Sequence, residues 1–150
     1  MSQVALGFAC SEAEMAQANQ FCKAGDTARM MATLRRRDVG AFGWSGYVIV
    51  VLAEWLTARG IGLPRASTPA TADLIARTDP MLCATQAQAR SLAAALRALA
   101  PTDEDLARHW SAFTGEDPPE ARQFMAAGLA WLTRLAEAGA ANDWCLLLEG

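Results

Sequence analysis

The sequence predicts a single helix-dominated α+β domain over residues 1–150, and three observations support this fold class. Alanine, which has the highest intrinsic helix propensity, is the most abundant residue. Capping signals of the form Ser/Thr-x-x-Glu/Gln or Asp precede several amphipathic stretches. Three short apolar segments, at 4–10, 81–84 and 144–149, are typical of strands. We expect a small three-stranded sheet packed by six or seven helices; the alternative is an all-α fold in which these segments are coil or helix ends.

The N-terminal third begins with the strand expected at 4–10. Ser11 and Glu14 then form a capping box, and the helix it starts should end at Gly25. Asp26 is placed to cap a second helix, which extends through about residue 37. The glycine-rich loop 40–46, AFGWSG after its first glycine, separates this helix from the central stretch.

The stretch from Trp44 to Leu63 is the most apolar part of the chain. Its β-branched residues favour a strand, but the apolar run continues too far for a short strand. Ser45 can serve as an N-cap and Gly60 as a C-terminal glycine, so we prefer a buried helix. The unbroken apolar run is far shorter than the ~20 residues that a membrane-spanning helix needs.

The C-terminal half carries further start and stop signals. A connection at 60–69 and a short helix at 71–77 precede the strand at 81–84. Capping boxes at Thr85 and Thr102 start two amphipathic helices. Asp117 is expected to cap the last and longest helix, which should end at Gly139 before the strand at 144–149.

Charge is distributed unevenly along the chain. The net charge is −3, but residues 1–100 sum to +3 and residues 101–150 to −6. This balance argues against general nucleic-acid binding, which needs a basic surface. The single arginine-rich cluster, Arg29 with Arg35, Arg36 and Arg37, is explained by the dipole at a helix C-terminus.

Six carboxylates between residues 103 and 120 are the first candidate partner-binding set. They fall at two expected helix N-termini, where acidic side chains also stabilise the helix dipole. If the two N-termini lie together, they form one acidic surface that attracts a basic partner. The six residues are Asp103, Glu104, Asp105, Glu116, Asp117 and Glu120.

Two aromatic residues of the 40–46 loop, Phe42 and Trp44, are the second candidate set. The spacing of the loop glycines does not match a dinucleotide-binding fingerprint. The two aromatic side chains either pack on the core or lie exposed as interface anchors. Tryptophan is enriched in the energetically dominant positions of protein interfaces.

Residue types that carry out catalysis show no recognisable pattern. His109 is the only histidine, and the four cysteines are dispersed, so we expect no metal site, no cofactor and reduced buried thiols. Glu54 within the central apolar stretch is a candidate acid or base, although a position at the helix edge explains it as well. The sequence contains no signal peptide, and we expect a cytoplasmic protein that binds neither nucleic acid nor membrane.

The order of these elements resembles that of small bacterial cytosolic α+β proteins, among them the immunity proteins of polymorphic toxin systems. The resemblance covers most of the chain, rests on architecture and assigns no functional residue. It implies a non-enzymatic inhibitor of the immunity, antitoxin or phage-encoded anti-defence type, whose acidic surface masks a basic site on a partner protein. The alternatives are a small ligand-binding domain or enzyme with a pocket near the 40–46 loop, and a subunit of a larger helical assembly.

Overall fold

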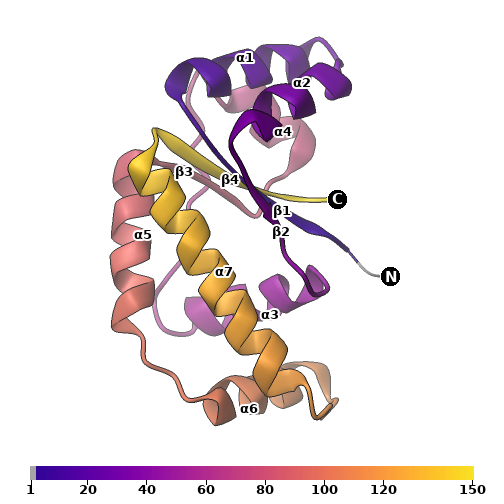
Figure 1. Cartoon of the computed structure of the whole chain (residues 1–150), viewed down its shortest axis with the longest axis vertical. Helices are drawn as coiled ribbons and strands as arrows, with labels where there is room; N and C mark the ends of the chain where they lie inside the picture. Colours follow the sequence, from indigo (N-terminus) through magenta and orange to yellow (C-terminus); the bar gives the residue numbers. More distant parts are fainter. Residues whose placement is uncertain (1–2) are drawn as a thin grey trace.

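The computed structural model describes residues 3–150, apart from the side chain of Arg37, and places one antiparallel sheet between two groups of helices (Figure 1). The class is α+β, as the sequence predicts, and the all-α alternative is wrong. The elements in chain order are β1 (Ala5–Cys10), α1 (Glu12–Lys23), α2 (Thr27–Leu34), a 3₁₀ turn (Arg35–Arg37), β2 (Asp38–Ala41), α3 (Tyr47–Thr57), α4 (Ala72–Thr78), β3 (Leu82–Thr85), α5 (Gln86–Ala98), α6 (Asp103–Thr114), α7 (Ala121–Ala141) and β4 (Trp144–Glu149).

The sheet has four strands in the order β2-β1-β4-β3, so the three-stranded prediction is wrong by one strand. The three expected strands are present, and β2 is the addition. It pairs antiparallel with β1, where Gly40 lies opposite Gly7. Its four residues include a glycine and an aspartate, which are depleted in strands, so nothing local indicated a strand.

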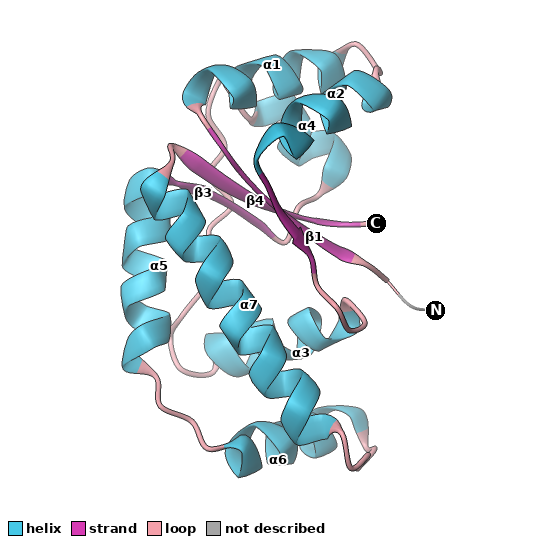
Figure 2. Cartoon of the chain, viewed as in Figure 1, coloured by secondary structure: helices cyan, strands magenta, loops and turns pink. Residues whose placement is uncertain are grey.

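Both faces of the sheet are covered by helices. Helices α1, α2 and α4 lie on one face, and α3, α5, α6 and α7 lie on the other (Figure 2). Side chains of strand β4 alternate between the two faces of the sheet, so they contribute to the hydrophobic core on each face. Trp144, Leu146 and Leu148 pack toward the first group, whereas Cys145 and Leu147 pack toward the second.

The capping residues identified in the sequence lie at the observed starts of four helices, α1, α2, α5 and α6. Each of Ser11, Thr85 and Thr102 accepts a hydrogen bond from the backbone N–H three residues on, and each forms the complete reciprocal box. Asp26 likewise accepts from the N–H of Arg29 at 3.1 Å. These side chains satisfy backbone donors that would otherwise have no partner at the helix N-termini.

The central apolar stretch is a helix, α3, rather than a strand. It begins at Tyr47 with Gly46 as its N-cap, so the expectation that Ser45 is the N-cap is wrong by one residue. The Ser45 hydroxyl instead accepts from the Tyr47 N–H at 3.3 Å, in the turn before the helix. At the other end Gly60 adopts φ +77°, and the Ile61 N–H donates to the Leu56 carbonyl at 3.0 Å. This is the glycine termination that the sequence predicts.

Two expectations about the last helix are wrong. Asp117 does not cap it, because α7 begins at Ala121 and the Asp117 carboxylate instead accepts from the Ser111 hydroxyl at 3.1 Å. Gly139 does not end it either, since α7 continues to Ala141. Gly139 is buried inside the helix at a close contact with β4 and α5.

All four cysteines lie in the described residues as buried free thiols, which confirms the expectation that they are buried. Burial raises the pKa of the Cys83 and Cys145 thiols to about 12. None of the helices between residues 3 and 150 is long and apolar enough to cross a membrane.

The buried thiols should resist alkylation in the native protein. With a pKa near 12, only about one thiol in ten thousand is ionised at pH 8, and the thiolate is the reactive form. We expect iodoacetamide to leave Cys83 and Cys145 unmodified in buffer and to modify both in concentrated urea, as read by peptide mass spectrometry. Equal labelling rates in the two solutions would contradict this burial.

Candidate functional site

The structure brings the two acidic runs together on one end of the molecule. Helix α6 packs against α7 at this end of the molecule (Figure 1), and Glu104 in the first turn of α6 reaches Arg122 in the first turn of α7. A hollow of about 650 Å³ lies between α6 and the segment that leads into α7. Its walls include Glu104, Asp117 and Arg122. The expected juxtaposition of the two helix N-terminal regions is therefore present.

Two arginines partly neutralise this acidic surface. Arg122 approaches Glu104 to 2.7 Å, and Arg108 approaches Asp105 to 3.7 Å. Both pairs are substantially exposed, where ion pairs stabilise a fold little. Hydrogen bonding from the Thr102 backbone N–H also lowers the pKa of Asp105.

The remaining four carboxylates form no ion pair within residues 3–150, and all four are exposed. Six carboxylates against two arginines leave this surface with a net charge of about −4. The unpaired carboxylates belong to Asp103, Glu116, Asp117 and Glu120.

The two aromatic candidates separate in the structure. Phe42 is only 6% exposed, and its ring centroid lies 5.6 Å from that of Trp131, so it belongs to the core. The expectation that Phe42 anchors a partner is therefore wrong. Trp44, in contrast, is 38% exposed and lines an open cleft.

This cleft is the strongest candidate site. It measures about 570 Å³ and is formed where residues 44–48 meet α6 and α7. We call it the aromatic cleft. Its lining residues are Trp44, Ser45, Tyr47, Val48, Trp110, Glu120 and Phe124.

Four aromatic rings of the cleft form a continuous series of contacts, from Tyr47 through Trp110 and Phe124 to Trp44. Trp110 and Phe124 form the inner pair, with centroids 4.5 Å apart and planes at 65°. Tyr47 meets Trp110 at 5.8 Å, and Trp44 meets Phe124 at 5.8 Å, both in edge-to-face arrangements. Tyr47 is 41% exposed and Trp110 only 7%, so two accessible rings flank a buried pair.

Gly46 positions the two accessible rings. Its N–H donates to the Gln3 carbonyl at 2.6 Å, which ties the start of α3 to the segment before β1. A Cβ at this position would lie 3.1 Å from that carbonyl oxygen, so the close approach favours glycine. Trp44 and Tyr47 stand on either side of this anchored residue in the chain.

Glu120 connects the aromatic cleft to the acidic surface, because it belongs to both. Among the residues that the structure describes, no arginine or lysine lines the cleft. The arrangement suits the binding of an apolar or cationic group and offers no nucleophile paired with a base.

The other residues considered for catalysis do not converge. Glu54 is exposed on α3 and lines none of the clefts described here. The Nε2 atom of His109 lies 3.2 Å from the Val51 carbonyl oxygen, and its ring stacks on that of the exposed Phe113. In the part of the chain that the structure describes, no three His, Cys, Asp or Glu residues are grouped to hold a metal ion.

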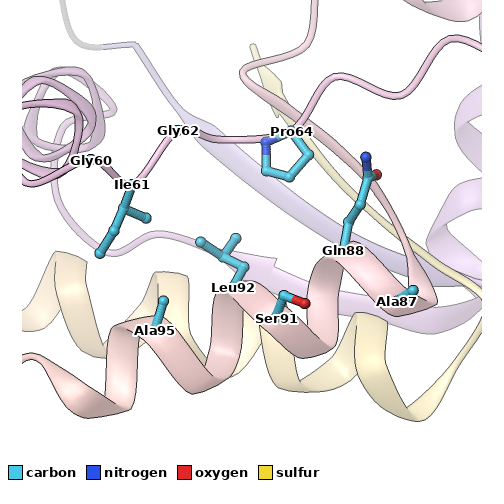
Figure 3. A pocket seen from close by; sticks show the side chains of 9 residues that line it. All are labelled: Gly60, Ile61, Gly62, Pro64, Ala87, Gln88, Ser91, Leu92 and Ala95. Atoms are coloured by element: carbon cyan, nitrogen blue, oxygen red, sulfur yellow. The ribbon is translucent and has the colours of Figure 1, made fainter.

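A second cleft, of about 400 Å³, lies between the 60–64 connection and α5 (Figure 3). Ile61 and Leu92 face one another across it, and no ionisable side chain lines it. The Oε1 atom of Gln88 is already engaged by the Thr85 N–H at 3.0 Å. The polar side chains of this cleft in the described residues are the neutral Ser91 and Gln88, so the lining offers no charged group to orient a ligand.

Sequence reasoning missed the three other aromatic members of the cleft: Tyr47, Trp110 and Phe124. Trp110 and Phe124 are buried in the structure, as apolar residues of an amphipathic helix usually are. A tyrosine at the exposed start of an apolar helix was the one available local signal.

Comparisons of the chain with protein-family models, with curated proteins and with solved structures found no match. The functional argument therefore depends on the site itself.

Proposed function

We propose that this protein is a non-enzymatic, protein-binding inhibitor of the immunity, antitoxin or phage-encoded anti-defence type. It binds a basic site on a partner protein through the acidic surface of residues 103–120 and the adjoining aromatic cleft. The observation that carries the proposal is Glu120, which places an unpaired carboxylate at the junction of the two features.

The chemistry of the two features is complementary. Exposed aromatic rings next to a buried aromatic pair match the composition of energetically dominant interface positions, which are rich in tryptophan and tyrosine. A surface of about four uncompensated carboxylates speeds the approach of a basic partner and disfavours acidic ones. The lack of a convergent catalytic group favours binding over turnover as the activity.

The test compares three immobilised proteins in lysate from the source cells. The first is the wild type. The second carries Glu116→Gln and Glu120→Gln, and the third carries Gln17→Lys and Gln20→Lys on the exposed side of α1, across the sheet. Both variants raise the net charge from −3 to −1, so they differ only in where the charge changes.

We expect a partner that is captured by the wild type and the α1 variant and is recovered roughly tenfold less by the Glu116/Glu120 variant. Quantitative mass spectrometry at low and moderate salt provides the measurement. Equal recovery of all proteins on the three matrices would contradict the proposed surface.

A ligand-binding domain is the second candidate function. The aromatic cleft begins at Trp44 and Ser45, at the end of the 40–46 loop where a pocket was expected. Its apolar lining and volume suit a small molecule. Retention of a small molecule by the purified protein, found by mass spectrometry after denaturation, would favour this candidate.

A further inference from the structure

In the described part of the chain, the aromatic cleft combines four rings with one carboxylate and no cationic side chain. Aromatic rings carry a negative electrostatic potential over their faces and attract cations. A carboxylate at the rim of such a group adds a formal negative charge. The cleft is therefore matched to a positively charged group that also has apolar surface.

The two arginines of the acidic surface do not occupy this position. Arg122 and Arg108, the two arginines of the acidic surface, are engaged by Glu104 and Asp105. Neither arginine lines the aromatic cleft. Glu120 forms no ion pair in residues 3–150, so its charge is available to an incoming group.

We infer that the aromatic cleft receives an arginine side chain of the partner, with the guanidinium against the rings of Trp44 and Tyr47 and directed toward Glu120. This inference rests on the proposed function and specifies which partner group is recognised. Arginine fits better than lysine because its planar guanidinium stacks on aromatic rings and forms paired hydrogen bonds with a carboxylate.

The same contact already exists elsewhere in the chain. The guanidinium carbon of Arg59 lies 3.8 Å from the centroid of the Trp55 ring, and its Nη1 donates to the Trp55 carbonyl at 3.2 Å. An arginine from a partner would make an equivalent contact with the exposed rings of the cleft. The remaining carboxylates of residues 103–120 would then attract neighbouring basic residues.

A peptide titration tests this inference without knowledge of the partner. The probe is a five-residue peptide in which three arginines alternate with two glycines. In the matched control, citrulline replaces each arginine, which keeps the planar shape and removes the charge. A third peptide carries lysine at the same positions.

The readout is the set of five indole N–H signals in the NMR spectrum of the 15N-labelled protein, assigned by single Trp→Phe variants. We expect the arginine peptide to shift the signals of Trp44 and Trp110 and to leave those of Trp55, Trp131 and Trp144 unchanged. Trp44→Ala and Glu120→Gln should each weaken binding roughly tenfold. The variant with Gln17→Lys and Gln20→Lys should bind the peptide as the wild type does.

Because Trp44 is exposed, the Trp44→Ala protein should keep its remaining indole signals in place, which separates lost binding from lost folding. Equal shifts with the citrulline or lysine peptide would overturn the assignment to arginine. The absence of any shift at Trp44 and Trp110 would overturn the site.

The two proposals fail in different ways. Arginine-specific shifts together with equal capture of lysate proteins by all three matrices would overturn the inhibitor function and leave the cleft's preference for arginine standing. Charge-dependent capture with no peptide-induced shift would overturn the arginine site alone.

Discussion

Replacing Trp131 with alanine is expected to lower the free energy of unfolding by about 3–5 kcal/mol, because a large buried side chain is lost and a cavity remains. Trp131 is 3% exposed, and it contacts Phe42 across the core. On the sheet its ring packs over Gly7, where a Cβ would lie only 3.0 Å from the Trp131 Cζ2 atom. Because Gly7 has no side chain, position 7 offers no atoms that could fill the cavity left by the indole.

Denaturation in urea, followed by circular dichroism, measures this loss independently of tryptophan fluorescence. Trp131→Phe should cost less, since it keeps a ring and removes an indole N–H that is buried without a hydrogen-bond partner in the described residues. Trp44→Ala, at an exposed position, should change stability by less than about 1 kcal/mol. Similar midpoints for Trp131→Ala and Trp44→Ala would contradict the packing described here.

Replacing Gly139 with alanine is expected to destabilise the protein by about 1–3 kcal/mol, the usual cost of overpacking. Helix propensity alone predicts the opposite sign, since alanine is favoured over glycine inside a helix by about 1 kcal/mol. A Cβ at position 139 would lie 2.7 Å from the Cys145 Cβ and 2.9 Å from the Ala89 Cβ. Neither neighbour can rotate away, because backbone geometry fixes a Cβ atom, so α7 must shift from β4 and α5.

Gly128→Ala in the same helix is the matched control. A Cβ there would meet the Leu52 Cδ1 atom at 2.6 Å and the Val48 Cγ1 atom at 3.1 Å. Because these atoms are the ends of side chains, they can move by rotation, and we expect a smaller loss of stability than for Gly139→Ala. A stabilised Gly139→Ala protein, or the reverse order of the two variants, would show that the helix moves away at low cost.

The two glycines also show what the sequence could and could not predict. Capping boxes at Ser11, Thr85 and Thr102 are local, so the sequence placed those helix starts correctly. Gly139 resembles a helix-ending glycine, yet its role is a close contact with β4 and α5 that no local pattern reveals. Strand β2 was missed for the same reason, since its pairing with β1 is what makes it a strand.

The candidate site shows the same difference between features that are local in the sequence and features that depend on tertiary packing. The acidic residues and Trp44 were identified from composition and charge, which are visible in the sequence. The cleft was not, because residues 44–48, α6 and α7 are brought together by tertiary packing. Phe42 was chosen as a site residue but is buried, because no local pattern distinguishes which of the two loop aromatics packs into the core.

The position of β4 inside the sheet governs when a newly made chain can fold. Strand β4 joins β1 to β3, so before residues 144–149 are synthesised the two halves of the sheet have no common strand. Until then the ribosome-bound chain presents the apolar surfaces of both helical layers to the surrounding solution. Such pairing between residues far apart in sequence slows folding. The nascent protein should therefore depend on chaperones that cover hydrophobic surface, and its folding should complete in one cooperative step once β4 is in place.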